Sequence, residues 1–145
     1  MSAFAPDSSH YTMRGAYYPT DHVFTMFSDL PAARAAAEQV AALPGVGKVT
    51  LAAPDAIEQA FAERAAEVGG APSVGREDQF MLRFVELARA GKVGVLIEVA
   101  DADTEALGTL LDAAGAALAY LYRTLVIEEL VDPSRRAEAA AAGKL

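Results

Sequence analysis

The sequence contains no cysteine and no tryptophan, and basic residues are scarce. Without thiols, the chain has no disulfide, no cysteine-ligated zinc or iron–sulfur cluster and no thiolate nucleophile. Twelve Lys and Arg against twenty Asp and Glu give a net charge of -8. A chain of this charge repels a phosphate backbone, so we expect no nucleic-acid partner.

Long apolar runs are also missing. The longest uncharged stretch near the end, residues 113–122, is ten residues long and contains a glycine. It is well short of the roughly 20 residues that cross a bilayer. Residues 1–10 lack the basic start and the apolar run of a secretory signal peptide. We therefore expect a cytoplasmic protein without membrane contact.

Hydrophobic residues make up 53% of the 145 residues, but 33 residues are alanine, which buries little area. A chain of this length still buries roughly two thirds of the surface that its unfolded form exposes. That is enough for a core without disulfides or a structural metal. We expect a single α+β domain.

Five segments divide the chain. We expect residues 1–21, which carry four aromatic side chains, to form an irregular arm. Residues 22–53 and 92–131 each have the pattern of a strand, a helix and a strand. We expect residues 54–91 to form two helices inserted between these halves, and residues 132–145 to form an alanine-rich terminal helix that frays.

Candidate caps precede three of the predicted helices. Side-chain oxygens at these positions accept hydrogen bonds from the first backbone N–H groups of a helix. The candidates are Ser28 or Asp29, Asp55 with Glu58 three residues later, and Asp101 or Asp103. Residues 124–130 remain open, because their pattern fits a strand after a bend and also the beginning of a helix.

An internal repeat relates the two ends of the chain. Residues 23–29 and 95–101 are each a short apolar strand followed by Ser-Asp or Ala-Asp, a helix, a Gly-containing turn and another strand. Two such halves predict a ferredoxin-like fold, with a four-stranded antiparallel sheet and both helices on one face. We expect residues 23–28 and 93–99 to be adjacent, parallel, central strands.

Residues 23–42, 87–103 and 110–116 carry a family resemblance. Their order of helix, glycine, valine-rich strand, acidic turn, helix and Gly-Ala resembles bacterial general-stress proteins of the heat-induced, 17M-like type. The resemblance covers less than half of the chain, and amphipathic helices replace the glycine-rich apolar middle of those proteins. It implies a small accessory protein and brings no catalytic residues with it.

Side chains of a strand alternate between the two faces of a sheet, which separates a helix-facing row from a second face. Val93, Val95, Ile97 and Val99 should meet the helices. The second face should carry Phe24, Met26, Leu96 and Glu98, joined by either Tyr120 and Tyr122 or Leu121 and Arg123. This face is too apolar for water, and three covers fit it: the inserted helices, the sheet of a second subunit, or a ligand.

The leading hypothesis is a non-enzymatic interaction or stress-accessory module that associates through this sheet face. Its expected form is a homodimer, with another protein as an alternative partner. The expected interface residues are Phe24, Met26, Leu96, Tyr17 and Tyr18.

The alternative hypothesis is a small-molecule binder or cofactor-free enzyme of the dimeric α+β barrel type. Its ligand-binding residues would be Glu98, Tyr120, Tyr122, Arg123 and His22. His10 and His22 have no metal-ligand spacing, and no nucleophile elbow surrounds Ser9. We therefore expect no catalytic residues, no metal and no cofactor.

Overall fold

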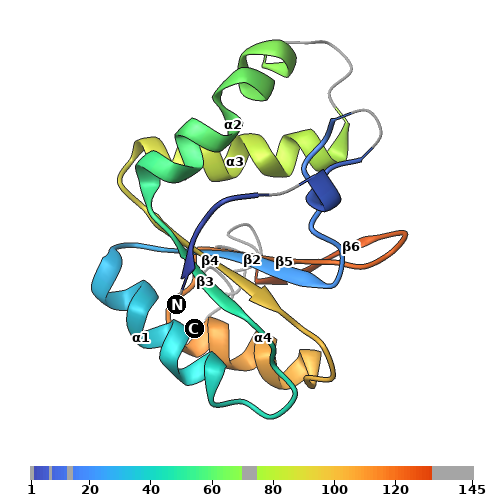
Figure 1. The fold of residues 1–145 in the computed structure, drawn as a ribbon. Helices are drawn as coiled ribbons and strands as arrows, with labels where there is room; N and C mark the ends of the chain where they lie inside the picture. The colour runs from blue at the N-terminus through green and yellow to red at the C-terminus, as the bar shows by residue number, and fades with distance from the viewer. Residues whose placement is uncertain (1, 7, 13–14, 70–74, 132–145) are drawn as a thin grey trace, which may run out of the picture.

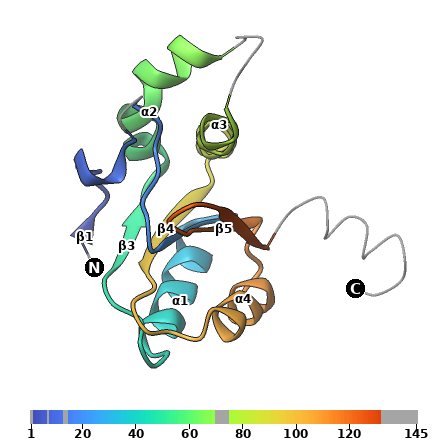
Figure 2. The ribbon, with the colours of Figure 1, turned by 90° about the vertical axis from the view of Figure 1, so that its right-hand side faces the viewer.

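The computed structural model describes residues 2–6, 8–12, 15–69 and 75–131. It is an α+β fold in which one sheet lies between two helical layers (Figure 1, Figure 2). The strands are β1 (Ser2–Ala3), β2 (His22–Phe27), β3 (Val49–Ala52), β4 (Val93–Glu98), β5 (Leu118–Tyr122) and β6 (Ile127–Val131). The helices are the 3-10 helix η1 (Ser8–His10), α1 (Leu30–Ala41), α2 (Pro54–Val68), α3 (Arg76–Arg89) and α4 (Thr104–Ala113). In the described segments, none of the helices has the length and apolarity to cross a membrane.

The sheet has six strands in the order β1-β3-β4-β2-β5-β6. The expectation of four strands was wrong at both edges. On one side β6 extends the sheet beyond β5, which resolves residues 124–130 as a turn and a strand. On the other side β1, from the segment expected to be irregular, pairs in parallel with β3. The predicted terminal helix, residues 132–145, lies outside the described residues.

The central strands β2 and β4 are adjacent, with Phe24 opposite Leu96, but they run antiparallel. The expected parallel direction was therefore wrong. In each half, the crossover helix returns the chain parallel to the first strand of that half. The two strands of one half are not neighbours, because the first strand of the other half lies between them and runs in the opposite direction. Thus β4 lies between β2 and β3, and β2 lies between β4 and β5.

Helices α1 and α4 cover one face of the sheet, below it in Figure 1. Their starts follow the sequence: Asp29 Oδ1 accepts a hydrogen bond from Ala32 N at 2.9 Å, and Asp103 accepts from Glu105 N and Ala106 N. Their buried faces, with alanines from α1 and two leucines from α4, meet the apolar rows of the strands. The fully buried helix residues in this layer are Ala33, Ala36, Ala37, Val40, Leu107 and Leu111.

The start of α2 differs from the expected capping box at Asp55. The helix begins at Pro54, and its N-cap is Ala53, whose side chain accepts no hydrogen bond. Proline serves the first turn well because the N–H that it lacks has no partner there in any helix. Asp55 lies inside the first turn, where its carboxylate accepts from Ala56 N at 2.9 Å.

Helices α2 and α3 cover the opposite face of the sheet together with the arm (Figure 2). The inserted helices are therefore the cover, one of the three alternatives that the sequence left open. Ten of the eleven aromatic side chains lie in this layer, and the exception is Phe27. Phe4 and Tyr17 of the arm pack into it edge-on, with Phe4 at 5.7 Å from Phe24 and Tyr17 at 6.1 Å from Phe24 between ring centroids.

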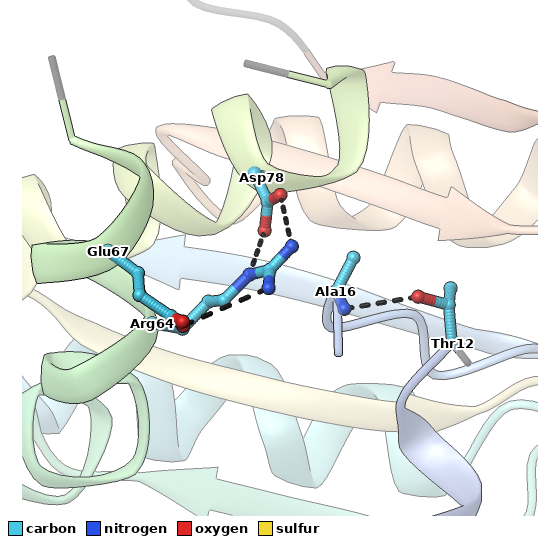
Figure 3. Close-up of polar contacts among 5 residues, drawn as sticks. All are labelled: Thr12, Ala16, Arg64, Glu67 and Asp78. Atoms are coloured by element: carbon cyan, nitrogen blue, oxygen red, sulfur yellow. Dashed lines mark hydrogen bonds and ion pairs between the residues drawn. The ribbon is translucent and has the colours of Figure 1, made fainter. Parts of the chain in front are cut away.

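A partly buried ion pair joins α2 to α3 (Figure 3). Arg64 donates to Asp78 through Nε at 3.1 Å and through Nη2 at 2.8 Å. A turn of the arm lies beside the guanidinium, and there Ala16 N donates to Thr12 Oγ1 at 3.1 Å (Figure 3). Gly15 in this turn has φ +86°, and a Cβ on it would lie 3.3 Å from Arg64 Nη1. The arm, α2 and α3 thus form one packed layer.

Candidate functional site

Four polar side chains line up across one end of the central strands. His22, the first residue of β2, stands opposite Glu98 of β4 and opposite Tyr122 of β5. Glu98 N donates to Lys48 O at 2.9 Å, which adds Lys48 to the row just before β3 begins. Strand geometry places all four side chains on the sheet face that bears the arm and α2–α3.

A cavity of about 350 Å³ opens over three of these residues. The aromatic and polar side chains of the arm form one side, and the sheet forms the other. Leu96 and Thr50 are buried, so they make a floor behind the charged row. The arm supplies Phe4, Ala5, Ser9 and His10, and the sheet supplies His22, Lys48, Thr50, Leu96 and Glu98.

His22 is held by a backbone hydrogen bond. Its Nδ1 lies 3.0 Å from Thr20 O, and because a carbonyl oxygen only accepts, Nδ1 carries the proton. In neutral His22, Nε2 is then the acceptor nitrogen. The ring of His10 lies 5.2 Å from that of His22, centroid to centroid. The two imidazoles therefore form one wall of the cavity.

Glu98 lies over a glycine that gives it room. A Cβ on Gly47 would overlap the Glu98 carboxylate, and Gly47 N donates to Glu98 O at 2.8 Å. Neither Glu98 nor Lys48 forms an ion pair or a side-chain hydrogen bond with any residue that the structure describes. The cavity thus contains one carboxylate and one ammonium group, both without an internal partner in the described segments.

Backbone strain flanks both strands of the site. Asp21, just before His22, has φ 64°, and Ala100, two residues after Glu98, has φ 47°. Alanine in this left-handed region is uncommon, and such strain persists only where the surroundings hold it. The surroundings do so here, since Asp21 N donates to Tyr122 O at 2.7 Å and Asp21 O accepts from Val99 N at 3.0 Å.

Both predicted ligand-binding tyrosines, Tyr120 and Tyr122, are buried in the aromatic layer and do not line the cavity. Tyr120 accepts a hydrogen bond from Arg83 and stacks on Phe80 at 4.1 Å. The Tyr122 hydroxyl is buried and has no hydrogen-bond partner among the described residues. Burial raises its pKa well above 10, and nearby tyrosines, Tyr17 first, add to this.

Arg123, the fifth predicted ligand-binding residue, is exposed at the β5–β6 turn. Its Nε donates to Glu128 Oε2 at 2.9 Å, so it belongs to the hairpin and not to the cavity. Of the five predicted residues, the structure brings His22 and Glu98 together at one site. Tyr120, Tyr122 and Arg123 do not line this cavity, and ligand binding by any of the five stays a prediction.

The predicted interface residues are covered by their own chain. Phe24, Met26, Leu96 and Tyr17 are buried beneath the arm and α2–α3. Tyr18 is half-buried, and its hydroxyl donates to Arg123 O at 2.5 Å. Pairing of two copies stays a prediction, but this sheet face gives no reason for it.

Sequence reasoning missed Lys48, Thr50 and the arm residue His10 as members of one site. A signal for the first two was present: in residues 48–52, Lys48 and Thr50 share one face, opposite Val49 and Leu51. His10 had no such signal. In the part of the chain that the structure describes, no three His, Cys, Asp or Glu side chains converge as a metal site requires.

Comparisons with known proteins find no relative of this chain. No family model, no curated protein and no solved structure matches the chain.

Proposed function

We propose that the protein binds a small molecule in the cavity between its arm and its sheet. One observation carries the proposal: His22 and Glu98, opposite each other on β2 and β4, share a cavity of about 350 Å³ with Lys48 and His10. Ligand sites are typically concave, roughly 300–1000 Å³ in volume, with a few polar groups over an apolar wall. Leu96 and Phe4 supply that wall.

The position of the site favours this function over association through the sheet face. Association needed Phe24, Met26 and Leu96 to be accessible, and these side chains are buried within the chain. A small-molecule binder needs only an opening between the arm and the sheet, and the cavity over the polar strand ends is such an opening. A stress-accessory role, a homodimer and a cytoplasmic location stay predictions.

We also infer that the two strand-helix-strand halves form a ferredoxin-like repeat. The order β3-β4-β2-β5 at the centre of the sheet and the position of α1 and α4 on one face support it. In this view β1 and β6 are additions at the edges, and α2–α3 is an insertion that leaves the cavity at one end.

A ligand screen with a cavity-filling variant tests the proposal. Amino acids, carboxylates, amines, sugars and nucleosides are screened for a rise in melting temperature, which reports binding to the folded state. Thr50→Phe fills the cavity from its floor and should abolish the rise. Thr109→Phe, a matched change on the exposed side of α4, should keep it. A screen without any hit, or equal binding by Thr50→Phe, would overturn the proposal.

A further inference from the structure

We infer that the ligand of this cavity is a zwitterion, a small molecule with both an ammonium and a carboxylate group, such as a free α-amino acid. The inference rests on the proposed binding function and names the chemical class of its ligand. It follows from two opposite charges, those of Lys48 and Glu98, that share the cavity and have no partner among the described residues.

The two charged residues are neighbours in the sheet. Glu98 N donates to Lys48 O at 2.9 Å, and both side chains lie on the cavity face. Residues opposite each other on adjacent strands have Cβ atoms about 4.5–5.5 Å apart, within reach of a direct ion pair. Their N and O atoms nevertheless lie beyond 4 Å, since no Lys48–Glu98 ion pair forms. A ligand with one charge of each sign can satisfy both groups at once.

Glu98 is the better fixed of the two groups. The carboxylate lies over Gly47, where the missing Cβ leaves space for it, and Glu98 is half-buried. Lys48 is exposed and has a flexible side chain, so its ammonium group can move to a carboxylate on the ligand. The site therefore combines a placed acceptor for an ammonium group with an adaptable donor for a carboxylate.

The two opposite charges in the lining select against ligands with a net charge. A simple anion would meet Lys48 but leave its charge facing the Glu98 carboxylate, and a simple cation would have the reverse mismatch. With Nδ1 bonded to Thr20 O, a neutral His22 ring would offer Nε2 as a further acceptor for an ammonium hydrogen. Leu96 and Phe4 provide an apolar wall for the rest of the ligand.

Three matched probes test the inference: L-leucine, 4-methylpentanoate, which lacks its ammonium group, and 3-methylbutylamine, which lacks its carboxylate. Their dissociation constants are measured by calorimetry on the full chain at pH 7. We expect leucine to bind at least about tenfold more tightly than either analogue, because a charge-assisted hydrogen bond is lost with each deletion.

Two variants assign the charges. Glu98→Gln should bind leucine and 4-methylpentanoate equally, and Lys48→Met should bind leucine and 3-methylbutylamine equally. Glu63→Gln, on the exposed side of α2, should keep the full preference for leucine. All three positions lie outside the core, so each variant should fold. Thermal melts followed by circular dichroism check this.

The outcomes separate the two proposals. If 4-methylpentanoate or 3-methylbutylamine binds as tightly as leucine, the zwitterion inference is overturned while the cavity remains a binding site. The zwitterion inference is also overturned if none of the three probes binds but a compound of another chemical class does. The cavity remains a binding site in that case, provided that Thr50→Phe abolishes the binding. If nothing binds, the proposed function itself is overturned.

Discussion

The Arg64 guanidinium and the Asp78 carboxylate meet side-on through two hydrogen bonds, at 3.1 and 2.8 Å, between α2 and α3. The hydrogen bond to Asp78 is the main reason why the pKa of Arg64 is raised, so the guanidinium stays charged. About a quarter of the Arg64 side chain is exposed, against 9% of the Asp78 side chain. The pair is thus unequal in its access to water.

This inequality predicts unequal losses. Arg64→Met leaves a buried carboxylate without its partner and should lower the free energy of unfolding by about 3 kcal/mol. Asp78→Asn leaves a partly hydrated guanidinium that can turn to Glu67, 3.9 Å away, and should lower it by about 1–2 kcal/mol. Urea denaturation measures both. Arg34→Met, at an exposed position of α1, is the control and should cost less than about 0.5 kcal/mol. Equal losses from the two variants would contradict the prediction.

The α4 layer gives a second prediction. Leu107 and Leu111 are fully buried against the sheet, so Leu107→Ala and Leu111→Ala should each lower the free energy of unfolding by about 2–5 kcal/mol. Leu110, which is only half-buried, serves as the matched control and should lose less in Leu110→Ala. Losses below about 1 kcal/mol at Leu107 or Leu111 would show that this face of α4 does not pack as described.

Two neighbouring tyrosines predict opposite effects of the same chemical change. Tyr120→Phe removes the hydrogen bond from Arg83 and should lower the free energy of unfolding by about 1 kcal/mol. Tyr122→Phe removes a buried hydroxyl that has no partner among the described residues, and it should raise this free energy by up to about 1 kcal/mol. Chemical denaturation at pH 7 measures both, and a clear loss in Tyr122→Phe would mean that its hydroxyl is bonded.

The raised pKa of Tyr122 predicts a loss of stability in alkali. In the unfolded chain this tyrosine loses its proton near pH 10, while the folded state retains it. The unfolded state then binds fewer protons, so stability falls as the pH rises above 10. Between pH 10 and 11 the native chain should lose up to about 1.4 kcal/mol more than Tyr122→Phe. Parallel curves for the two proteins would contradict the prediction.

Gly47→Ala tests whether the position of the Glu98 carboxylate matters apart from its charge. The added Cβ would overlap the carboxylate, whose side chain can move aside. Stability should therefore change by less than about 1 kcal/mol, because the adjustment falls on a flexible side chain. The tenfold preference for leucine over 4-methylpentanoate should nevertheless shrink. A retained preference, measured by calorimetry, would show that the carboxylate needs no fixed place.

Period-two alternation predicted the two faces of the sheet correctly. Phe24 and Leu96 are opposite each other on the second face, and Val93 and Ile97 face α1 and α4. Caps at Asp29 and Asp103 also followed from local chemistry, because a side-chain oxygen and its N–H partners lie within three residues. These features depend on neighbours in the sequence or on strand pleating alone.

The direction of β4 and the roof of the cavity depend on contacts between distant segments. The antiparallel pairing of β2 and β4 follows from how two halves interlock, which no single strand reveals. His10 reaches the cavity because Phe4 and Tyr17 anchor the arm in the aromatic layer, where both rings contact Phe61 of α2, more than 40 residues further along the chain. An arm without periodicity carries no local signal for such a position.

Because the aromatic side chains are concentrated in the α2–α3 layer, spectroscopic signals from aromatic rings report on this layer far more than on the α1–α4 layer. With no tryptophan, near-ultraviolet absorption and fluorescence come from tyrosine and phenylalanine, and ten of these eleven rings lie on the α2–α3 side. These signals report whether the arm and α2–α3 are docked. Opening of the alanine-rich α1–α4 layer would be nearly silent in them and must be followed by amide hydrogen exchange.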